Sequence, residues 1–284
     1  MKNSETKKLA CYVISLNPDD LNFIRIMKSL KEQGIHAEHF PAVDGRNAYP
    51  ALEGNERISE VMSMLRVRRL LTSSEVGCYL SHLRAVKKAY NEGYDYVCVL
   101  EDDVVIEPEF GNTVRALLSE NLDIVRLMAL KLRRRKPLRE IVYGIMLTRP
   151  ERGTLGTQAY MMSRTGMKKF IDHASVIYEA IDHVLDHFFL FDLETYAVEP
   201  HVVFELDSAS SIAKKHQKTT RRPSLFERLA YHPVKLYFSI LRHWYLLRHQ
   251  SEMYPATWPM NRPGKSKRLR GKGDGEKVLS GHMG

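Results

Sequence analysis

Three adjacent carboxylates, Glu101, Asp102 and Asp103, interrupt the apolar stretch that runs from Tyr96 to Ile106. The stretch is short and rich in β-favouring residues, and Gly93 precedes it, which predicts a buried strand rather than a helix. Burial of three unpaired charges inside such a strand would be strongly unfavourable. We therefore expect the carboxylates at the carboxyl end of the strand, where open α/β sheets bind their ligands.

The order of side chains along a strand indicates which of these carboxylates can bind one ligand together. In an extended strand, Glu101 and Asp103 would share one face and Asp102 would lie on the other. Two carboxylates on one face suit a hard divalent cation, Mn²⁺ or Mg²⁺, bound together with a diphosphate. The alternative is a solvated acidic turn, which is common at strand ends.

The first 45 residues indicate the fold class. Residues 10–16 and 37–43 read as strands, and between them a helix carries Leu21, Ile24, Met27 and Leu30 at helical spacing. A β-α-β opening predicts a largely parallel sheet covered by helices. No Gly-rich phosphate loop follows the first strand, so phosphate binding would need a metal, arginines or helix termini.

A further helix is predicted to begin near Thr72. Thr72 and Glu75 form a capping-box pattern, and apolar residues recur after them at helical spacing. Small residues such as Gly77 and Ser81 would let this helix pack closely on another element. His82 in the same helix is either a buried structural histidine, which is the commoner case, or a catalytic residue.

These two regions together resemble glycosyltransferase family 25, which includes bacterial lipooligosaccharide galactosyltransferases and collagen galactosyltransferases. The resemblance rests on EVGCYLSH at residues 75–82, followed by LEDD at residues 100–103. It covers roughly residues 8–212, with further matches at 13–16, 42–45, 156–163 and 180–182.

The resemblance implies a GT-A fold, a Rossmann-like α/β domain with a mostly parallel mixed sheet, here followed by a helical C-terminal extension. It also implies metal-dependent transfer of a hexose from a UDP-sugar with inversion, with galactose ahead of glucose. We expect three parts: a transferase domain at 1–213, a basic aromatic helical extension at 214–250 and a basic disordered tail at 251–284.

Site residues follow from the same matches. The general base is expected to be Asp182, with Asp186 second and His82 as a third candidate. Asp103 and Glu101 are the expected metal ligands for Mn²⁺ or Mg²⁺. The expected donor-binding residues are Glu75, Ser81, Glu101, Asp102, Gly156, Thr157 and Tyr160.

Charge is unevenly distributed along the chain. Residues 214–284 hold 16 Lys/Arg and 4 Asp/Glu, whereas residues 1–213 hold 27 and 30. Such asymmetry predicts an anionic partner. Residues 225–247 combine aromatic, basic and apolar side chains, which suits a helix in a membrane interface, or alternatively a helix packed on the core.

These features predict a location and an acceptor. Neither a signal peptide nor an apolar run of membrane-spanning length is visible, so we expect a cytoplasmic protein, peripheral at the inner face of the inner membrane. The expected partners are a UDP-sugar, a lipid-linked oligosaccharide acceptor and an anionic membrane surface. The rival interpretations are a nucleic-acid-binding protein, although no recognised motif for nucleic acid occurs, and a non-catalytic domain.

Three other segments have predicted roles. The basic run at 132–137 is expected to be a solvated loop, or alternatively a contact to phosphates. Residues 197–204, with Pro200 near their middle, read as an edge strand. His201 within this strand, or Asp207 after it, could approach the metal or the diphosphate. His183 and His187 lack the H-E-x-x-H pattern, so zinc is not expected. The three cysteines read as buried thiols.

Overall fold

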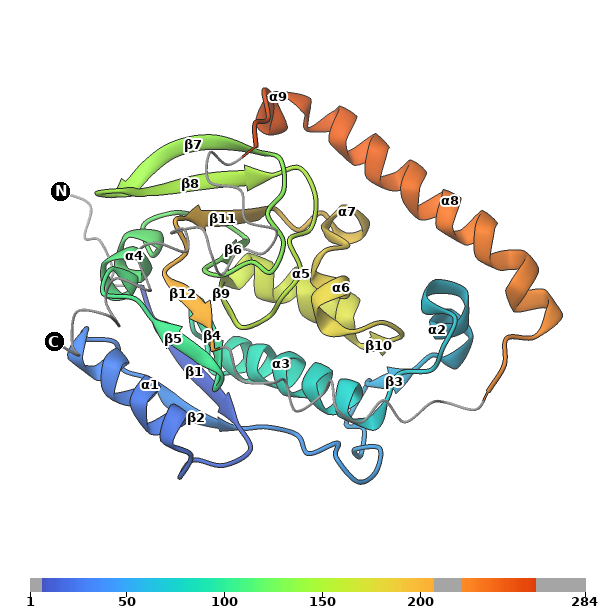
Figure 1. Cartoon of the computed structure of the whole chain (residues 1–284), viewed down its shortest axis with the longest axis horizontal. Helices are drawn as coiled ribbons and strands as arrows, with labels where there is room; N and C mark the ends of the chain where they lie inside the picture. Colours follow the sequence, from blue (N-terminus) through green and yellow to red (C-terminus); the bar gives the residue numbers. More distant parts are fainter. Residues whose placement is uncertain (1–6, 207–220, 259–284) are drawn as a thin grey trace, which may run out of the picture.

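The computed structural model of the chain describes residues 7–206 and 221–258, and an eight-stranded mixed sheet lies at its centre (Figure 1). β1 pairs in parallel with β2 and β4, and β6 with β11, whereas β9 and β8 run antiparallel to their neighbours. The strands in spatial order are β2 (Glu38–Pro41), β1 (Leu9–Ser15), β4 (Tyr96–Glu101), β9 (Ala159–Ser163), β6 (Ile124–Arg126), β11 (Thr195–Glu199), β8 (Ile145–Pro150) and β7 (Arg135–Val142). The predicted β-α-β opening and mixed α/β class are confirmed.

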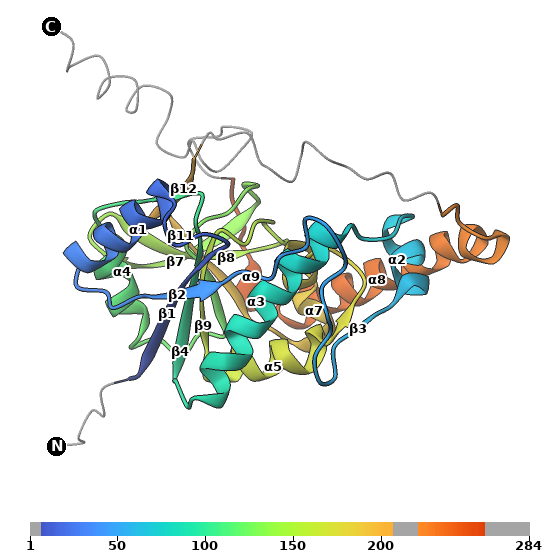
Figure 2. The same ribbon diagram turned by 90° about the horizontal axis from the view of Figure 1, so that it is seen from below.

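Helices cover both faces of this sheet (Figure 2). One face carries α1 (Leu21–Glu32) and α4 (Phe110–Leu117), and the other carries α3 (Ser73–Asn91), α5 (Arg164–Ala174), α6 (Ile181–Leu185) and α7 (Phe188–Phe191). The remaining helices are α2 (Glu60–Val67), α8 (Leu225–Arg248) and α9 (Gln250–Met253). Two small sheets pair β3 (Arg57–Ile58) with β10 (Val176–Ile177), and β5 (Val104–Ile106) with β12 (Val203–Glu205).

The central strand β4 is apolar on both sides because a helical layer covers each side. Val97 and Val99 belong to the core on the α3 side, whereas Cys98 and Leu100 belong to the core on the α1 side. All four are fully buried. Charged side chains are therefore tolerated only where the strand ends, and β4 ends at Glu101.

Two expectations about strands were wrong. Residues 96–106 are not one strand, because a turn at Asp102 and Asp103 separates β4 from β5, so the alternation of side chains expected for the three carboxylates does not apply. β11 is not an edge strand, since it lies between β6 and β8 and ends before Pro200.

Two expectations about other segments also need correction. The basic run expected to be a loop enters the edge strand β7 at Arg135. On α1 the buried residues are Phe23, Ile26 and Leu30, while Leu21 and Ile24 of the predicted apolar row are exposed. The cysteines are free; Cys11 and Cys98 are buried as predicted, whereas Cys78 is only half-buried.

The C-terminal extension contains one long helix. α8 packs against α2 and α7, and α9 reaches the β7–β8 hairpin. No helix within 7–206 and 221–258 is both long and apolar enough to cross a membrane. Asp207 and residues 259–284 of the predicted tail lie outside the described residues.

Candidate functional site

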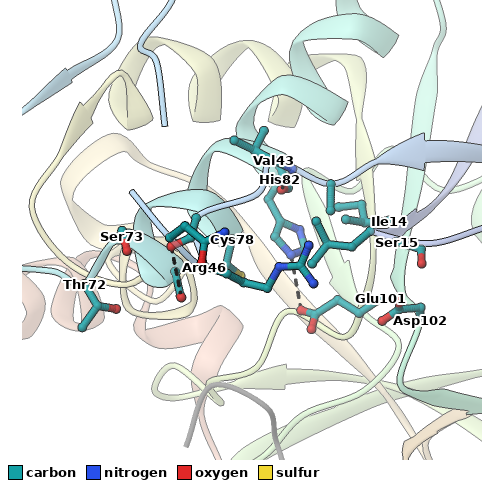
Figure 3. A pocket seen from close by; sticks show the side chains of 16 residues that line it. Ile14, Ser15, Val43, Arg46, Thr72, Ser73, Cys78, His82, Glu101 and Asp102 are labelled. Atoms are coloured by element: carbon teal, nitrogen blue, oxygen red, sulfur yellow. Dashed lines mark hydrogen bonds and ion pairs between the residues drawn. The ribbon is translucent and has the colours of Figure 1, made fainter. Parts of the chain in front are cut away.

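A cavity of about 540 Å³ opens at the carboxyl ends of β1, β2 and β4, beside the first half of α3 (Figure 3). Its size falls in the range of roughly 300–1,000 Å³ that is usual for small-molecule sites. Four parts of the chain line it, within residues 14–16, 42–47, 72–82 and 101–102. The cavity therefore occupies the sheet edge at which the sequence predicted a ligand.

One wall of the cavity is the loop after β2, which lies directly on α3. A Cβ atom at Gly77 would lie 2.6 Å from the Val43 carbonyl oxygen and 2.9 Å from the Gly45 nitrogen, so only glycine permits this approach. Ser81 Oγ accepts a hydrogen bond from the Val43 N–H and donates one to the Gly77 carbonyl, both at 2.8 Å. These residues of the EVGCYLSH segment thus hold the wall in place.

A buried polar network joins α3 to the end of β4. His82 Nε2 lies 3.3 Å from Glu101 Oε1 (Figure 3). His82 Nδ1 lies 3.2 Å from the Tyr160 hydroxyl. Thr157 Oγ1 donates to the same Glu101 oxygen at 2.5 Å. Burial raises the pKa of Glu101, but the hydrogen bonds from His82 and Thr157 and the charge interaction with His82 outweigh it, and the pKa lies below its ordinary value. Glu101 is therefore a carboxylate at neutral pH.

The ionised forms of Asp102 and Asp103 are stabilised less than that of Glu101. Burial raises the pKa of Asp102, and the nearby Ser15 hydroxyl offsets this only in part. Burial and the charges of Glu101, Glu205 and Asp102 raise the pKa of Asp103 to about 7. Asp103 Oδ1 is buried and has no hydrogen-bond partner among residues 7–206 and 221–258. A bound cation would neutralise the excess negative charge here and would give the buried Asp103 Oδ1 a partner.

The side chains present would supply only part of the coordination shell of a divalent metal ion. Carboxylate oxygens are the donors that Mg²⁺ and Mn²⁺ prefer, and Glu101 and Asp103 supply them. Among the described residues, no group of three or more His, Cys, Asp or Glu side chains is arranged to hold a metal. Mg²⁺ usually keeps waters and takes only one or two carboxylates beside substrate phosphates, so the residues present fit a shared site of that kind.

Arg126 organises a second group of site residues. It is fully buried in β6, and it donates to the Gly156 carbonyl at 2.5 Å and to Asp186 Oδ1 at 3.2 Å. Asp186 Oδ2 also accepts the Leu155 N–H at 2.9 Å. Gly156 has φ +83°, and a Cβ atom there would lie 2.5 Å from Gln158 Oε1. Asp186 is thus held in place by Arg126 and the loop before β9.

Asp182 lies in the first turn of α6 and is half-buried. It is close enough to the cavity-lining Cys78 to affect its thiol: burial and the charges of Glu101, Asp182, Asp103 and Glu75 raise the pKa of Cys78. Because the partners of Asp186 hold it elsewhere, Asp182 is the freer of the two carboxylates.

Glu75 contacts the start of α3. Its carboxylate accepts the Thr72 N–H at 2.8 Å, which completes the predicted capping box. It also binds the Arg69 guanidinium through two hydrogen bonds of 2.7 and 2.5 Å. Burial raises the pKa of Glu75, but these contacts outweigh it and the pKa lies below its ordinary value.

The structure brings most of the predicted site residues to one region. Ser81, His82, Glu101 and Asp102 line the cavity. Thr157 contacts Glu101, and Tyr160 contacts His82. Asp103, Asp182, Asp186, Gly156 and Glu75 lie outside its lining, and His201 lines a separate small cavity with Arg135 and Glu199.

Three site residues were missed by the sequence analysis. Ser15 and Arg46 line the cavity and follow the first two predicted strands, so the rule that parallel strands end at one edge could have found them. Arg46 is paired with Asp44 at 2.6 Å. Arg126 gave a different signal, since it is a charged residue inside a predicted buried strand.

These features define an α/β protein with an acidic small-molecule site at the carboxyl edge of its parallel strands. The model of "Glycosyltransferase family 25 (LPS biosynthesis protein)" matches residues 8–185, and the chain belongs to this family. The matched region contains the cavity-lining segments, Arg126 and Asp182, and it ends one residue before Asp186.

Relatives with assigned descriptions come from bacteria and animals. The lacto-N-neotetraose biosynthesis glycosyltransferase LgtE of Neisseria meningitidis is 26% identical over 212 residues, which are 66% of this chain and 71% of that protein. A glycosyltransferase 25 family member of Drosophila melanogaster is 34% identical over 122 residues, 41% of this chain and 20% of that protein. Procollagen galactosyltransferase 2 of Homo sapiens is 31% identical over 109 residues, 36% of this chain and 17% of that protein.

The matches differ in extent and in kind. The matched part of the chain spans about a fifth of the length of the Drosophila relative. A Rattus norvegicus relative, 32% identical over 113 residues (39% of this chain and 20% of that protein), is described as a probable inactive family member. Among solved structures, A197 from STIV superposes with a TM-score of 0.42 at 16% identity, covering 71% of this chain and 86% of that one, which is too low to establish a shared fold.

Proposed function

We propose that this protein is a metal-dependent, inverting glycosyltransferase of GT-A type that moves a hexose, galactose first, from a UDP-sugar to a saccharide acceptor in lipopolysaccharide or lipooligosaccharide biosynthesis. The observation that carries the proposal is the contact between His82 and Glu101. It joins the two motifs of the family at one cavity of a size suited to a nucleotide-sugar.

Donor binding is assigned to the acidic end of β4 and to the loop after β2. Glu101 and Asp103 would hold Mn²⁺ or Mg²⁺, which when bound neutralises the departing diphosphate. Arg46 lines the same cavity and offers a cation to the phosphates. Asp102 lines the cavity together with Ser15 and would contact the nucleoside part of the donor.

Proton transfer is assigned to Asp182. In an inverting transfer the acceptor oxygen forms a bond to the anomeric carbon while the bond to the diphosphate breaks, so UDP leaves and the hydroxyl proton must be taken up. Asp182 is half-buried near the cavity wall and would take that proton. Arg126 holds Asp186, and His82 is occupied on both ring nitrogens, which ranks them second and third.

The acceptor is proposed to be a lipid-linked oligosaccharide. The family description and the Neisseria relative both point to surface saccharide synthesis. On this proposal the protein works as a peripheral protein at the cytoplasmic face of a bacterial inner membrane. Its partners are then the UDP-sugar, the acceptor and the anionic lipid surface.

The experiment that tests this function is a transfer assay with the full chain. UDP-galactose or UDP-glucose is incubated with a lipooligosaccharide core acceptor and Mn²⁺, and both UDP release and the extended saccharide are measured. The proposal predicts product with one donor, loss of product with chelator, and a loss of about 10²-fold or more in Asp182→Asn. Asp172→Asn is the matched control, since Asp172 is an exposed carboxylate on α5 that pairs with Lys168.

The alternative is a non-catalytic role. It is supported by the rat relative that is described as a probable inactive family member. A binding domain of that kind would bind the donor with the same metal dependence but would form no product with any acceptor. Donor binding without transfer in the wild type, across both hexoses and both metals, would support this alternative.

A further inference from the structure

The outward side of α8 is largely apolar. α8 lies along the outside of the molecule, and within the described part of the chain its inner side packs on α2 and α7 (Figure 1). Successive helical residues turn by about 100°, so the exposed apolar side chains all fall within an arc of roughly 120°. We name them the outer face of α8: Leu225, Phe226, Leu229, Leu236, Tyr237, Ile240, Trp244 and Leu247, each between 57% and 73% exposed.

The inner side of α8 already has its partners, so the outer face is presented by an anchored helix. Phe238 lies under the Arg66 guanidinium at 3.6 Å and meets His187 edge to face at 5.4 Å. Tyr231 receives the Arg68 guanidinium at 3.8 Å. Tyr245 is buried against Phe188 at 5.3 Å. No rotation of the helix could bury the outer face without breaking these contacts.

The charged side chains that are exposed on α8 all carry a positive charge. Arg228, Lys235 and Arg248 are exposed on α8, together with His232 and His243. The only acidic residue within Leu225–Arg248 is Glu227, which is buried and paired with Arg221 at 2.7 Å. The exposed surface of the helix therefore consists of apolar, aromatic and cationic side chains without a carboxylate.

We propose that the outer face of α8 is a docking surface for an anionic lipid bilayer. A helix with apolar and aromatic residues on one side and cations along its flanks lies in the headgroup region, where its cations meet lipid phosphates. A second copy of the chain fits less well, because a two-fold interface would bring the cations of both copies together with no carboxylate between them.

This inference deepens the proposed function, because a lipid-linked acceptor would place the transferase at a membrane surface. Its test does not depend on catalysis. Trp244 lies on the outer face and Trp258 is the chain's other tryptophan, so Trp258→Phe leaves Trp244 as the only indole reporter. The full-length variant is mixed with vesicles of phosphatidylcholine alone, or with phosphatidylglycerol added, without any sugar donor.

With phosphatidylglycerol vesicles only, we expect Trp244 fluorescence to shift to the blue and to be protected from quenching by acrylamide. Leu236→Asn/Ile240→Asn in the same background should weaken vesicle binding by about tenfold or more, since the buried methylenes provide the insertion energy. The matched control is Leu21→Asn/Ile24→Asn, which changes an exposed Leu and Ile on α1 and should bind as the parent does. Transfer to a lipid-free saccharide should be unchanged in both double variants.

Three outcomes would overturn the proposal. One is equal vesicle binding by the Leu236→Asn/Ile240→Asn variant. Another is a Trp244 signal that shifts with protein concentration, and not with vesicles, which would assign the face to a second copy. The third is a Trp244 that is already shielded in the free monomer, which would mean that part of this chain covers it. Vesicle binding with no transferase activity would contradict the proposed function alone.

Discussion

The imidazole of His82 and the carboxylate of Glu101 lie 3.3 Å apart, Nε2 to Oε1, although they belong to different elements, α3 and the end of β4. The contact ties the helix that forms one cavity wall to the strand that delivers the carboxylates. It also lowers the pKa of Glu101 against the effect of burial. The shape of the cavity and the charge state of its main carboxylate therefore depend on the same pair.

Replacing His82 should weaken donor binding. His82→Gln keeps a polar side chain but removes the imidazole that supports Glu101. Loss of a group that orients a metal-binding carboxylate typically lowers affinity by about 10–100-fold, and we expect that range for metal-dependent binding of the UDP-sugar, measured by calorimetry. Tyr160→Phe removes only the hydroxyl at His82 Nδ1 and should have a smaller effect. If both variants lowered donor affinity equally, the role of the His82 imidazole in supporting Glu101 would be contradicted.

Gly77→Ala should displace the loop after β2. The new methyl group would lie 2.6 Å from the Val43 carbonyl oxygen, and such overpacking destabilises by about 1–3 kcal/mol. The affinity for the UDP-sugar should also fall, because the displaced loop lines the cavity. Urea unfolding and calorimetry measure the two effects. Asn91→Ala, an exposed position on the same helix, is the control and should change neither.

Arg126→Met should destabilise the fold strongly. It leaves the Asp186 carboxylate buried without its cation, and breaking a buried ion pair on one side costs about 3–5 kcal/mol. The double variant Arg126→Met/Asp186→Asn removes the unpaired charge and should recover part of this loss in urea unfolding. If the double variant were less stable than Arg126→Met, the buried charge would not be the cause.

His201 should make the protein sensitive to mild acid. Burial lowers its pKa from an ordinary value of 6.5 to about 3, so the folded state keeps it neutral while the unfolded state takes up a proton. Its contribution is complete above pH 6.5 and is lost progressively as the pH falls towards 3. Between pH 6.5 and 5.0, the wild type should lose about 1.5 kcal/mol more unfolding free energy than His201→Leu. Parallel losses in both proteins would contradict this.

Local patterns predicted the elements that carry the site. The capping box of Thr72 and Glu75 marked the start of α3, because it depends only on neighbouring residues. The unfavourable burial of charge placed Glu101 at the end of β4. The resemblance to family 25 was confirmed over residues 8–185.

Tertiary contacts decided the features that were missed. The turn at Asp102 and Asp103 exists because β5 leaves the main sheet to pair with β12, about 100 residues later in the chain. Leu21 and Ile24 have helical spacing, but Phe23 and Ile26 face the sheet instead. Arg126 is tolerated in a buried strand only because Gly156 and Asp186 accept its hydrogen bonds, and no local pattern records those partners.

The most direct test of the central claim is calorimetric binding of UDP-galactose and UDP-glucose to the wild type, to Asp103→Ala and to the control Asp172→Asn, each with Mn²⁺ and with chelator. The account predicts metal-dependent binding of one donor to the wild type and to Asp172→Asn, and its loss in Asp103→Ala. Failure of the wild type to bind either donor under any metal condition would contradict the assignment of this cavity to a nucleotide-sugar.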